Sequence, residues 1–114
     1  MKISVIISTY HRHNTLKSVL LAMKSQTHMP NEIIVIDQTP KPNIPKDFYV
    51  DFEKELPIKI IQGVKPSMTV SRNHGIMISK YEVLLIIDDD IVIKDNFIES
   101  HLMVMEDENV DVVN

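Results

Sequence analysis

The segment Val83-Leu84-Leu85-Ile86-Ile87-Asp88-Asp89-Asp90 joins five uninterrupted apolar side chains directly to three consecutive carboxylates. An apolar run without alternation is typical of a strand that is buried on both faces of a parallel sheet. It belongs to a series of five β-branched runs, which are Ile3–Ser8, Glu32–Asp37, Ile58–Ile61, Glu82–Ile87 and Val110–Val113. Because these runs start about 24 to 29 residues apart, the pattern indicates strand-plus-helix units rather than hairpins.

The segments between the runs carry helical patterns. Leu16, Val19, Leu20 and Met23 fall at helical spacing, with Asn14 as the expected N-cap. Further helices are predicted at Ser67 to Ser79 and Lys94 to Met105, with a short one at Asp47–Lys54 inside the proline-punctuated connection Thr39 to Pro57.

This alternation predicts one α/β domain with a mostly parallel, doubly wound, Rossmann-like sheet. Right-handed crossovers favour the strand order 3-2-1-4 plus a fifth strand, with helices on both faces. In such sheets ligands bind beyond the carboxyl ends of the strands. The polar clusters of the sequence follow those ends, at Thr9-Tyr10-His11-Arg12, Asp37, Ser71-Arg72-Asn73 and Asp88-Asp89-Asp90.

Length and composition exclude several classes of protein. The 114 residues contain 44% hydrophobic and 25% charged side chains, which is typical of a globular domain and not of a disordered chain. The net charge of -4 argues against a nucleic-acid-binding protein, and the absence of cysteine excludes a disulfide scaffold. No apolar run approaches the roughly 20 residues of a membrane span, and the N-terminal run ends too early for a signal peptide. A cytoplasmic location is therefore expected.

The acid triplet Asp88-Asp89-Asp90 is the strongest functional signal in the sequence. Adjacent carboxylates repel each other by on the order of 1 to 3 kcal/mol at a partly exposed site, unless a cation or hydrogen-bond donors compensate. In an extended segment Asp88 and Asp90 point to one side and Asp89 to the other. Two carboxylates facing solvent suit Mg²⁺ or Mn²⁺ bridging to a diphosphate. Helix capping or a solvated turn is an equally good explanation of the triplet alone.

Other side chains at the same edge have two explanations each. Asp37 could accept hydrogen bonds from a base or ribose, or from backbone N–H groups of the following turn. Arg12 and Arg72, the two arginines of the chain, suit phosphate oxygens but could form surface ion pairs. Tyr10 could stack on a base or be a half-buried ring. The histidines lack zinc-ligand spacing, and solvated or capping roles are expected for those at positions 11 and 74.

Four stretches in order resemble the nucleotide-binding half of a family 2 glycosyltransferase of the GT-A fold. They are Val5-Ile6-Ile7-Ser8-Thr9-Tyr10-His11-Arg12, Ile33-Ile34-Val35-Ile36-Asp37, Ser71-Arg72-Asn73-His74-Gly75-Ile76 and Leu84-Leu85-Ile86-Ile87-Asp88-Asp89-Asp90. Each stretch alone is a weak signal, and the four together cover nearly the whole chain.

The resemblance implies a role for each site residue. The nucleotide-binding residues would be Thr9, Tyr10, Arg12, Asp37, Arg72, Asp88 and Asp89. The metal ligands would be Asp90 and Asp88, the ends of an Asp-x-Asp motif that binds Mg²⁺ or Mn²⁺. The metal would neutralise the departing nucleoside diphosphate of a UDP-sugar donor while an acceptor hydroxyl attacks the anomeric carbon with inversion.

The resemblance also implies that the chain, residues 1–114, is the donor-binding part of a longer domain. The acceptor-binding part and the catalytic base would follow Asn114. The acceptor would be a sugar, a lipid-linked saccharide or a polysaccharide in cell-wall or polysaccharide biosynthesis, and the full-length protein could associate with a membrane. Apolar surface left open on such a fragment predicts a homodimer.

Two alternatives come from other classes of protein. A receiver-type phosphoacceptor domain has similar length and fold, but it would place an acidic pair where this chain has Thr9-Tyr10. The second alternative is a non-catalytic interaction module that has kept the fold and lost its site, against which Asp37, Arg72 and the intact triplet argue.

Overall fold

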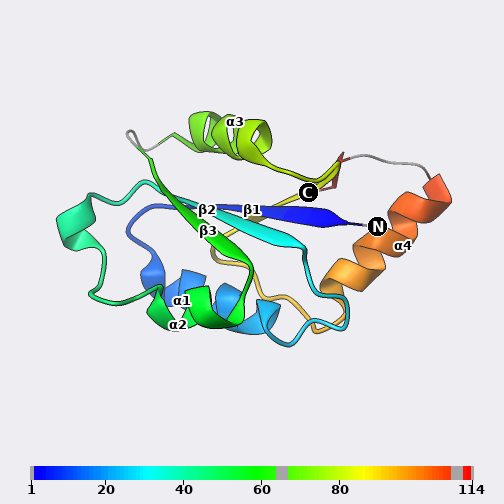
Figure 1. Cartoon of the computed structure of the whole chain (residues 1–114), viewed down its shortest axis with the longest axis horizontal. Helices are drawn as coiled ribbons and strands as arrows, with labels where there is room; N and C mark the ends of the chain where they lie inside the picture. The colour runs from blue at the N-terminus through cyan, green and yellow to red at the C-terminus, as the bar shows by residue number, and fades with distance from the viewer. Residues whose placement is uncertain (1, 64–66, 109–111, 114) are drawn as a thin grey trace.

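The computed structural model describes residues 2–63, 67–108 and 112–113. Short strands and helices alternate along them (Figure 1). The elements are β1 (Ile3–Thr9), α1 (His13–Met23), β2 (Glu32–Asp37), the 3₁₀ turn η1 (Lys41–Asn43), α2 (Val50–Glu55), β3 (Ile58–Gln62), α3 (Met68–Ile78), β4 (Val83–Asp88), α4 (Phe97–Glu108) and β5 (Val112–Val113).

The sheet is parallel, and its strand order is β3-β2-β1-β4-β5. The predicted order 3-2-1-4 is therefore confirmed. β5 is a two-residue strand beside Leu84 and Leu85, while Val110 and Asp111 of the expected fifth run lie outside the described residues. The pairings Thr9 with Asp37 and Ser8 with Asp88 bring the carboxyl ends of β2, β1 and β4 to one edge.

Helices cover both faces of the sheet, as the sequence predicts. In Figure 1, α1 and α2 lie below the sheet and α3 lies above it. The lower core joins alternate residues of β1, β2 and β4 to Leu16, Leu20 and Met23 of α1, and to Ile98 and Leu102 of α4. A smaller core under α3 contains Ile6, Ile34, Ile36 and Leu84. Both faces of β1 and β2 are buried, which explains why apolar and polar residues do not alternate along them.

Three predicted helix starts are wrong, and one of them is that of α2, which begins at Val50 and not at Asp47. α1 begins at His13, with Arg12 at the N-cap and no side-chain cap, so Asn14 is an exposed residue of the first turn and not the cap. α4 begins at Phe97, three residues after Lys94. The backbone N–H of Ile98 in its first turn donates to the buried side chain of Gln26, at 3.0 Å, so this helix is capped from a distant part of the chain.

The strand order also decides against the receiver-type alternative. Doubly wound signalling domains of that type have the order 2-1-3-4-5, in which the first strand lies between the second and third. Here β1 lies between β2 and β4. Within the part of the chain that the structure describes, no helix has the length and apolar character needed to cross a membrane.

Candidate functional site

The acid triplet begins at the last residue of β4 and turns its side chains in alternate directions. The side chains of Asp88 and Asp90 are each 49% exposed, whereas that of Asp89 is fully buried. The exposure alternates as predicted, but the segment is not extended throughout, because β4 ends at Asp88 and the next two acids lie in a turn. The edge of the sheet therefore presents two carboxylates to solvent and keeps the third inside.

Asp89 is held by Thr9, the last residue of β1, and by Arg12, which follows that strand. Thr9 Oγ1 donates to Asp89 Oδ2 at 2.8 Å, and Arg12 Nη2 lies 3.0 Å from Asp89 Oδ1. The same guanidinium reaches Asp90, with 3.3 Å between Nη1 and Oδ2. Burial raises the pKa of Asp89, and the Thr9 hydroxyl and the Arg12 charge only partly offset that effect. Asp89 is thus a buried carboxylate whose ionised form is only partly compensated.

Arg72 approaches the triplet from the other side, on α3. Its Nη2 lies 3.4 Å from Asp88 Oδ1. α3 begins at a capped turn, where Ser67 Oγ accepts from the N–H of Val70, and it is tied to β1 by a 2.6 Å hydrogen bond between the hydroxyls of Ser8 and Ser71. A pocket of about 220 Å³ opens beside this ion pair; it is lined by Arg72, Ile86, Ile87, Asp88, Ile91 and Phe97.

Asp37, at the end of β2, is fully buried and has several partners. Its Oδ2 accepts from Tyr49 Oη and lies 2.7 Å from His13 Nε2, while its Oδ1 accepts from the N–H of Thr39 at 3.0 Å. Burial by itself raises the pKa of Asp37, but the hydrogen bonds from Tyr49, His13 and Thr39 outweigh it and leave the pKa below its ordinary value. One oxygen of Asp37 therefore accepts from the backbone of the following turn, which is the second explanation given for this residue above. The other oxygen joins His13 and Tyr49 in a buried polar cluster.

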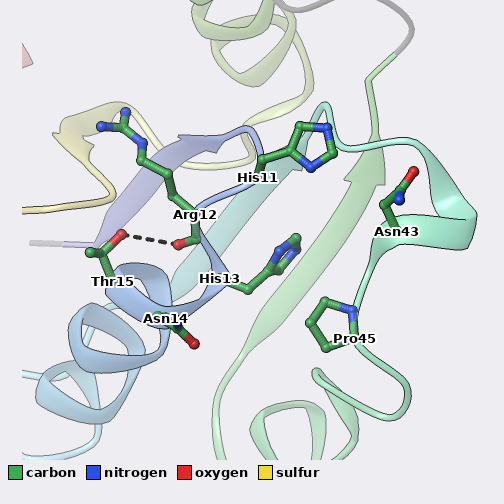
Figure 2. A pocket seen from close by; sticks show the side chains of 7 residues that line it. All are labelled: His11, Arg12, His13, Asn14, Thr15, Asn43 and Pro45. Carbon is green, nitrogen blue, oxygen red and sulfur yellow. Dashed lines mark hydrogen bonds between the residues drawn. The ribbon is translucent and has the colours of Figure 1, made fainter.

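A cavity of about 420 Å³ opens between the start of α1 and the loop after β2 (Figure 2). Its lining residues are His11, Arg12, His13, Asn14, Thr15, Asn43 and Pro45. His11 has a left-handed backbone, with φ of 53°, and its N–H donates to Thr39 Oγ1 at 2.8 Å. Tyr10 is 43% exposed and its ring packs edge-on against the His11 ring. In Figure 2 the guanidinium of Arg12 points away from the two imidazoles.

The structure brings most of the predicted site residues together. Thr9, Arg12, Asp89 and Asp90 form one contact group, and Arg72 with Asp88 adjoins it. Asp37 belongs instead to the buried cluster, and Tyr10 stands at the rim. The histidine at position 74 is exposed, and the one at position 11 lines the cavity.

Sequence reasoning missed His13 and Tyr49. A signal for His13 is present, since position 13 extends the apolar stripe of Leu16, Leu20 and Met23 by one helical step. Tyr49 lies 12 residues from Asp37, immediately before α2, and no comparable pattern in the sequence points to it.

The donor set at the triplet fits a divalent metal in one specific way. In the described part of the chain, no group of three or more His, Cys, Asp or Glu side chains is arranged to hold a metal ion. Asp88 and Asp90 nevertheless offer half-exposed carboxylate oxygens, and Mg²⁺ commonly takes one or two carboxylates and completes its shell with water and substrate phosphate. The residues therefore suit a metal that arrives with a phosphate ligand.

With this geometry in place, the comparison with known proteins identifies the family. Residues 4–114 match the family described as "Glycosyl transferase family 2". The chain therefore belongs to glycosyltransferase family 2.

Individual relatives agree with that assignment. The chain is 36% identical over 117 residues to "Uncharacterized glycosyltransferase YwdF" of Bacillus subtilis (strain 168), covering 99% of this chain and 41% of the relative. It is 28% identical over 110 residues to "Chondroitin synthase" of Pasteurella multocida (strain Pm70), covering 94% of this chain and 11% of the relative. The chain thus spans about two fifths or less of these curated relatives.

Solved structures show the same fold. The crystal structure of S. aureus TarS 1-349 superposes with a TM-score of 0.81 at 20% identity, covering 96% of this chain and 33% of TarS 1-349. The same TarS fragment in complex with UDP-GlcNAc gives a TM-score of 0.74 at 22% identity, covering 96% and 32% of the two chains. The sheet order and the covering helices are those of the GT-A fold.

Proposed function

We propose that this chain is the donor-binding part of an inverting, metal-dependent glycosyltransferase that uses a UDP-sugar. One arrangement carries the proposal: the two arginines of the chain meet all three acids of the triplet at the carboxyl edge of the sheet. Ligands bind at this edge in open parallel sheets. The TarS fragment was solved in complex with UDP and with UDP-GlcNAc, which favours a uridine nucleotide.

The exposed members of the site suit the nucleotide directly. Tyr10 is 43% exposed and would stack on a base, and the guanidinium groups of Arg12 and Arg72 match phosphate oxygens. The buried members of the site would act by positioning the exposed ones. Thr9 and Asp89 fix Arg12, and Asp37 would reach a base only by exchanging one of its internal donors.

The proposed metal ligands are Asp88 and Asp90, which would hold Mg²⁺ or Mn²⁺. When bound, such an ion supplies Lewis-acid stabilisation of charge on the leaving diphosphate. The acceptor is a sugar, a lipid-linked saccharide or a polysaccharide. Its hydroxyl would form a bond to the anomeric carbon as the bond to the diphosphate breaks, and its proton would pass to a general base. Arg12 and Arg72 would orient the diphosphate for that displacement.

Calorimetric titration of UDP, with and without Mn²⁺, tests the proposal. We expect binding that depends on Mn²⁺ and that weakens about tenfold or more, equivalent to about 1.4 kcal/mol, in Asp90→Ala and in Arg72→Ala. Asp51→Ala and Lys59→Ala, which remove matched charges from exposed positions on α2 and β3, should bind as the unaltered chain does. If none of the common nucleoside diphosphates binds, the interaction-module alternative is favoured.

A further inference from the structure

Arg12 holds the proposed metal ligand Asp90 in an ion pair. Its Nη1 lies 3.3 Å from Asp90 Oδ2, and both side chains are 49% exposed. Its Nη2 lies 3.0 Å from Asp89 Oδ1, so one guanidinium spans two consecutive carboxylates. A divalent cation on Asp90 Oδ2 would compete with Arg12 for that oxygen, and a cation on either oxygen would be repelled by the nearby guanidinium charge.

Asp89 gives this contact a fixed end. Its side chain is completely buried, and Thr9 holds its second oxygen at 2.8 Å. The contact with Asp90 is longer, and it joins two side chains that are each 49% exposed. Among the described residues Asp89 Oδ1 accepts no hydrogen bond, so a guanidinium that leaves Asp90 can turn toward this buried oxygen and keep its ion pair with Asp89.

A nucleoside diphosphate at this edge would compete for the released nitrogen. Its anionic oxygens form charge-assisted, bidentate hydrogen bonds with guanidinium groups. We infer that Arg12 blocks the metal ligand Asp90 in the nucleotide-free protein, and that a nucleoside diphosphate draws the guanidinium away, so that nucleotide and divalent cation bind cooperatively. This inference rests on the function proposed above.

Arg72 limits how far the effect extends. It pairs with Asp88 at 3.4 Å, from α3 rather than from α1, and among the described residues this half-exposed carboxylate is its ion-pair partner. When Arg12 moves away from Asp90, α3 does not need to move. The cooperativity should therefore depend mainly on Arg12.

Binding of Mn²⁺ alone is the decisive measurement, by calorimetry or by the electron paramagnetic resonance signal of free Mn²⁺. We expect Arg12→Gln to bind Mn²⁺ about fivefold more tightly than the unaltered chain, because the competing guanidinium is gone. Lys17→Gln is the matched control: it removes one positive charge from an exposed position of α1 and should leave Mn²⁺ affinity nearly unchanged. Circular dichroism checks that each variant is folded.

The second measurement repeats the Mn²⁺ titration with saturating UDP, after subtracting Mn²⁺–UDP association in solution. UDP should raise Mn²⁺ affinity by a larger factor in the unaltered chain than in Arg12→Gln. Unchanged or weaker Mn²⁺ affinity in Arg12→Gln overturns the inference, even if UDP binds normally. If UDP does not bind the unaltered chain at all, both the inference and the proposed function are overturned.

Discussion

Asp37 and Asp89 are buried carboxylates at neighbouring strand ends, and their pKa values move in opposite directions. Asp37 has donors on both oxygens, from Tyr49, His13 and the Thr39 backbone, so its pKa is lowered despite burial. Asp89 has one hydroxyl donor and one half-exposed guanidinium, so burial dominates and its pKa is raised. Asp37, which accepts more hydrogen bonds, stabilises the folded state when ionised, whereas ionised Asp89 destabilises it.

The raised pKa of Asp89 leads to a prediction about stability and pH. Because its pKa in the folded chain lies above the ordinary value of 3.8, ionised Asp89 opposes folding at neutral pH, and the cost disappears as the pH falls through the raised pKa. We expect Asp89→Asn, whose amide oxygen can still accept from Thr9, to raise the free energy of unfolding at neutral pH. The gain should shrink in acid. Urea unfolding across a pH series measures this.

Asp37→Asn serves as the opposite case in the same series. The pKa of Asp37 is lowered, so its ionised form stabilises the fold above 3.8 and that contribution is lost as the pH falls through the lowered value. This variant should therefore be less stable than the unaltered chain at neutral pH. An Asp89→Asn protein that is also less stable there would contradict the argument for Asp89.

At the residue scale, the sequence predicts which side chains lie at the sheet edge better than it predicts which of them contact each other. Apolar runs locate strand ends, and strand ends locate Asp37 and Asp88 to Asp90. The partners of those side chains come from other segments: Thr9 meets Asp89 across 80 positions and His13 meets Asp37 across 24. Such distant pairings leave no local periodicity, so the sequence alone does not identify them.

Among the elements, α3 holds Arg72 beside Asp88, and its closeness to the sheet depends on Gly75. A Cβ built at that position would lie only 2.5 Å from Ile6 Cγ2. Ile6 is completely buried in β1 and has little space to yield. The lack of a side chain at Gly75 therefore allows α3 to lie this close to the sheet.

We expect Gly75→Ala to push α3 away from β1 and to lower the free energy of unfolding by about 1 to 3 kcal/mol, as overpacked cores do. The better helix propensity of alanine, about 1 kcal/mol, offsets part of that loss. The same shift should weaken UDP binding through Arg72. Met77→Ala, at an 83% exposed position of the same helix, is the control for both measurements. If Gly75→Ala matches the unaltered chain in both stability and UDP affinity, the prediction is wrong, and β1 moves to accommodate the added methyl group.

Element types are predictable here, whereas helix starts are less so. Each strand run is bounded by polar residues or prolines, and each pairs in the expected parallel order. α1 starts at the left-handed turn of His11, whose N–H is held by Thr39. α4 starts where Gln26 reaches the N–H of Ile98. Both starts depend on side chains from other segments, so local capping rules gave the wrong residues.

On the scale of the whole molecule, several large apolar side chains are exposed. Met77 on α3 is 83% exposed, Met103 on α4 is 60% exposed, and Val92 after the triplet is 99% exposed. Exposed apolar groups favour association when they gather into a patch.

We propose that the 114-residue chain forms a homodimer at high concentration. Light scattering coupled to size exclusion should give a mass above the 13.1 kDa of the monomer, rising with concentration. The double variant Met77→Ser and Met103→Ser should lower the apparent mass, whereas Asp51→Asn should not. A monomeric mass at every concentration would refute this prediction.

The two loops that border the larger cavity are joined at three points. The N–H of Gln38 donates to the carbonyl of Thr9 at 2.8 Å, the N–H of His11 to Thr39 Oγ1 at 2.8 Å, and His13 meets Asp37 at 2.7 Å. Residues 9–13 and 37–39 are therefore held together on both sides of Arg12. A substitution at Thr39, which lies outside the proposed phosphate contacts, is therefore expected to shift Arg12 and to change the affinity for the proposed diphosphate.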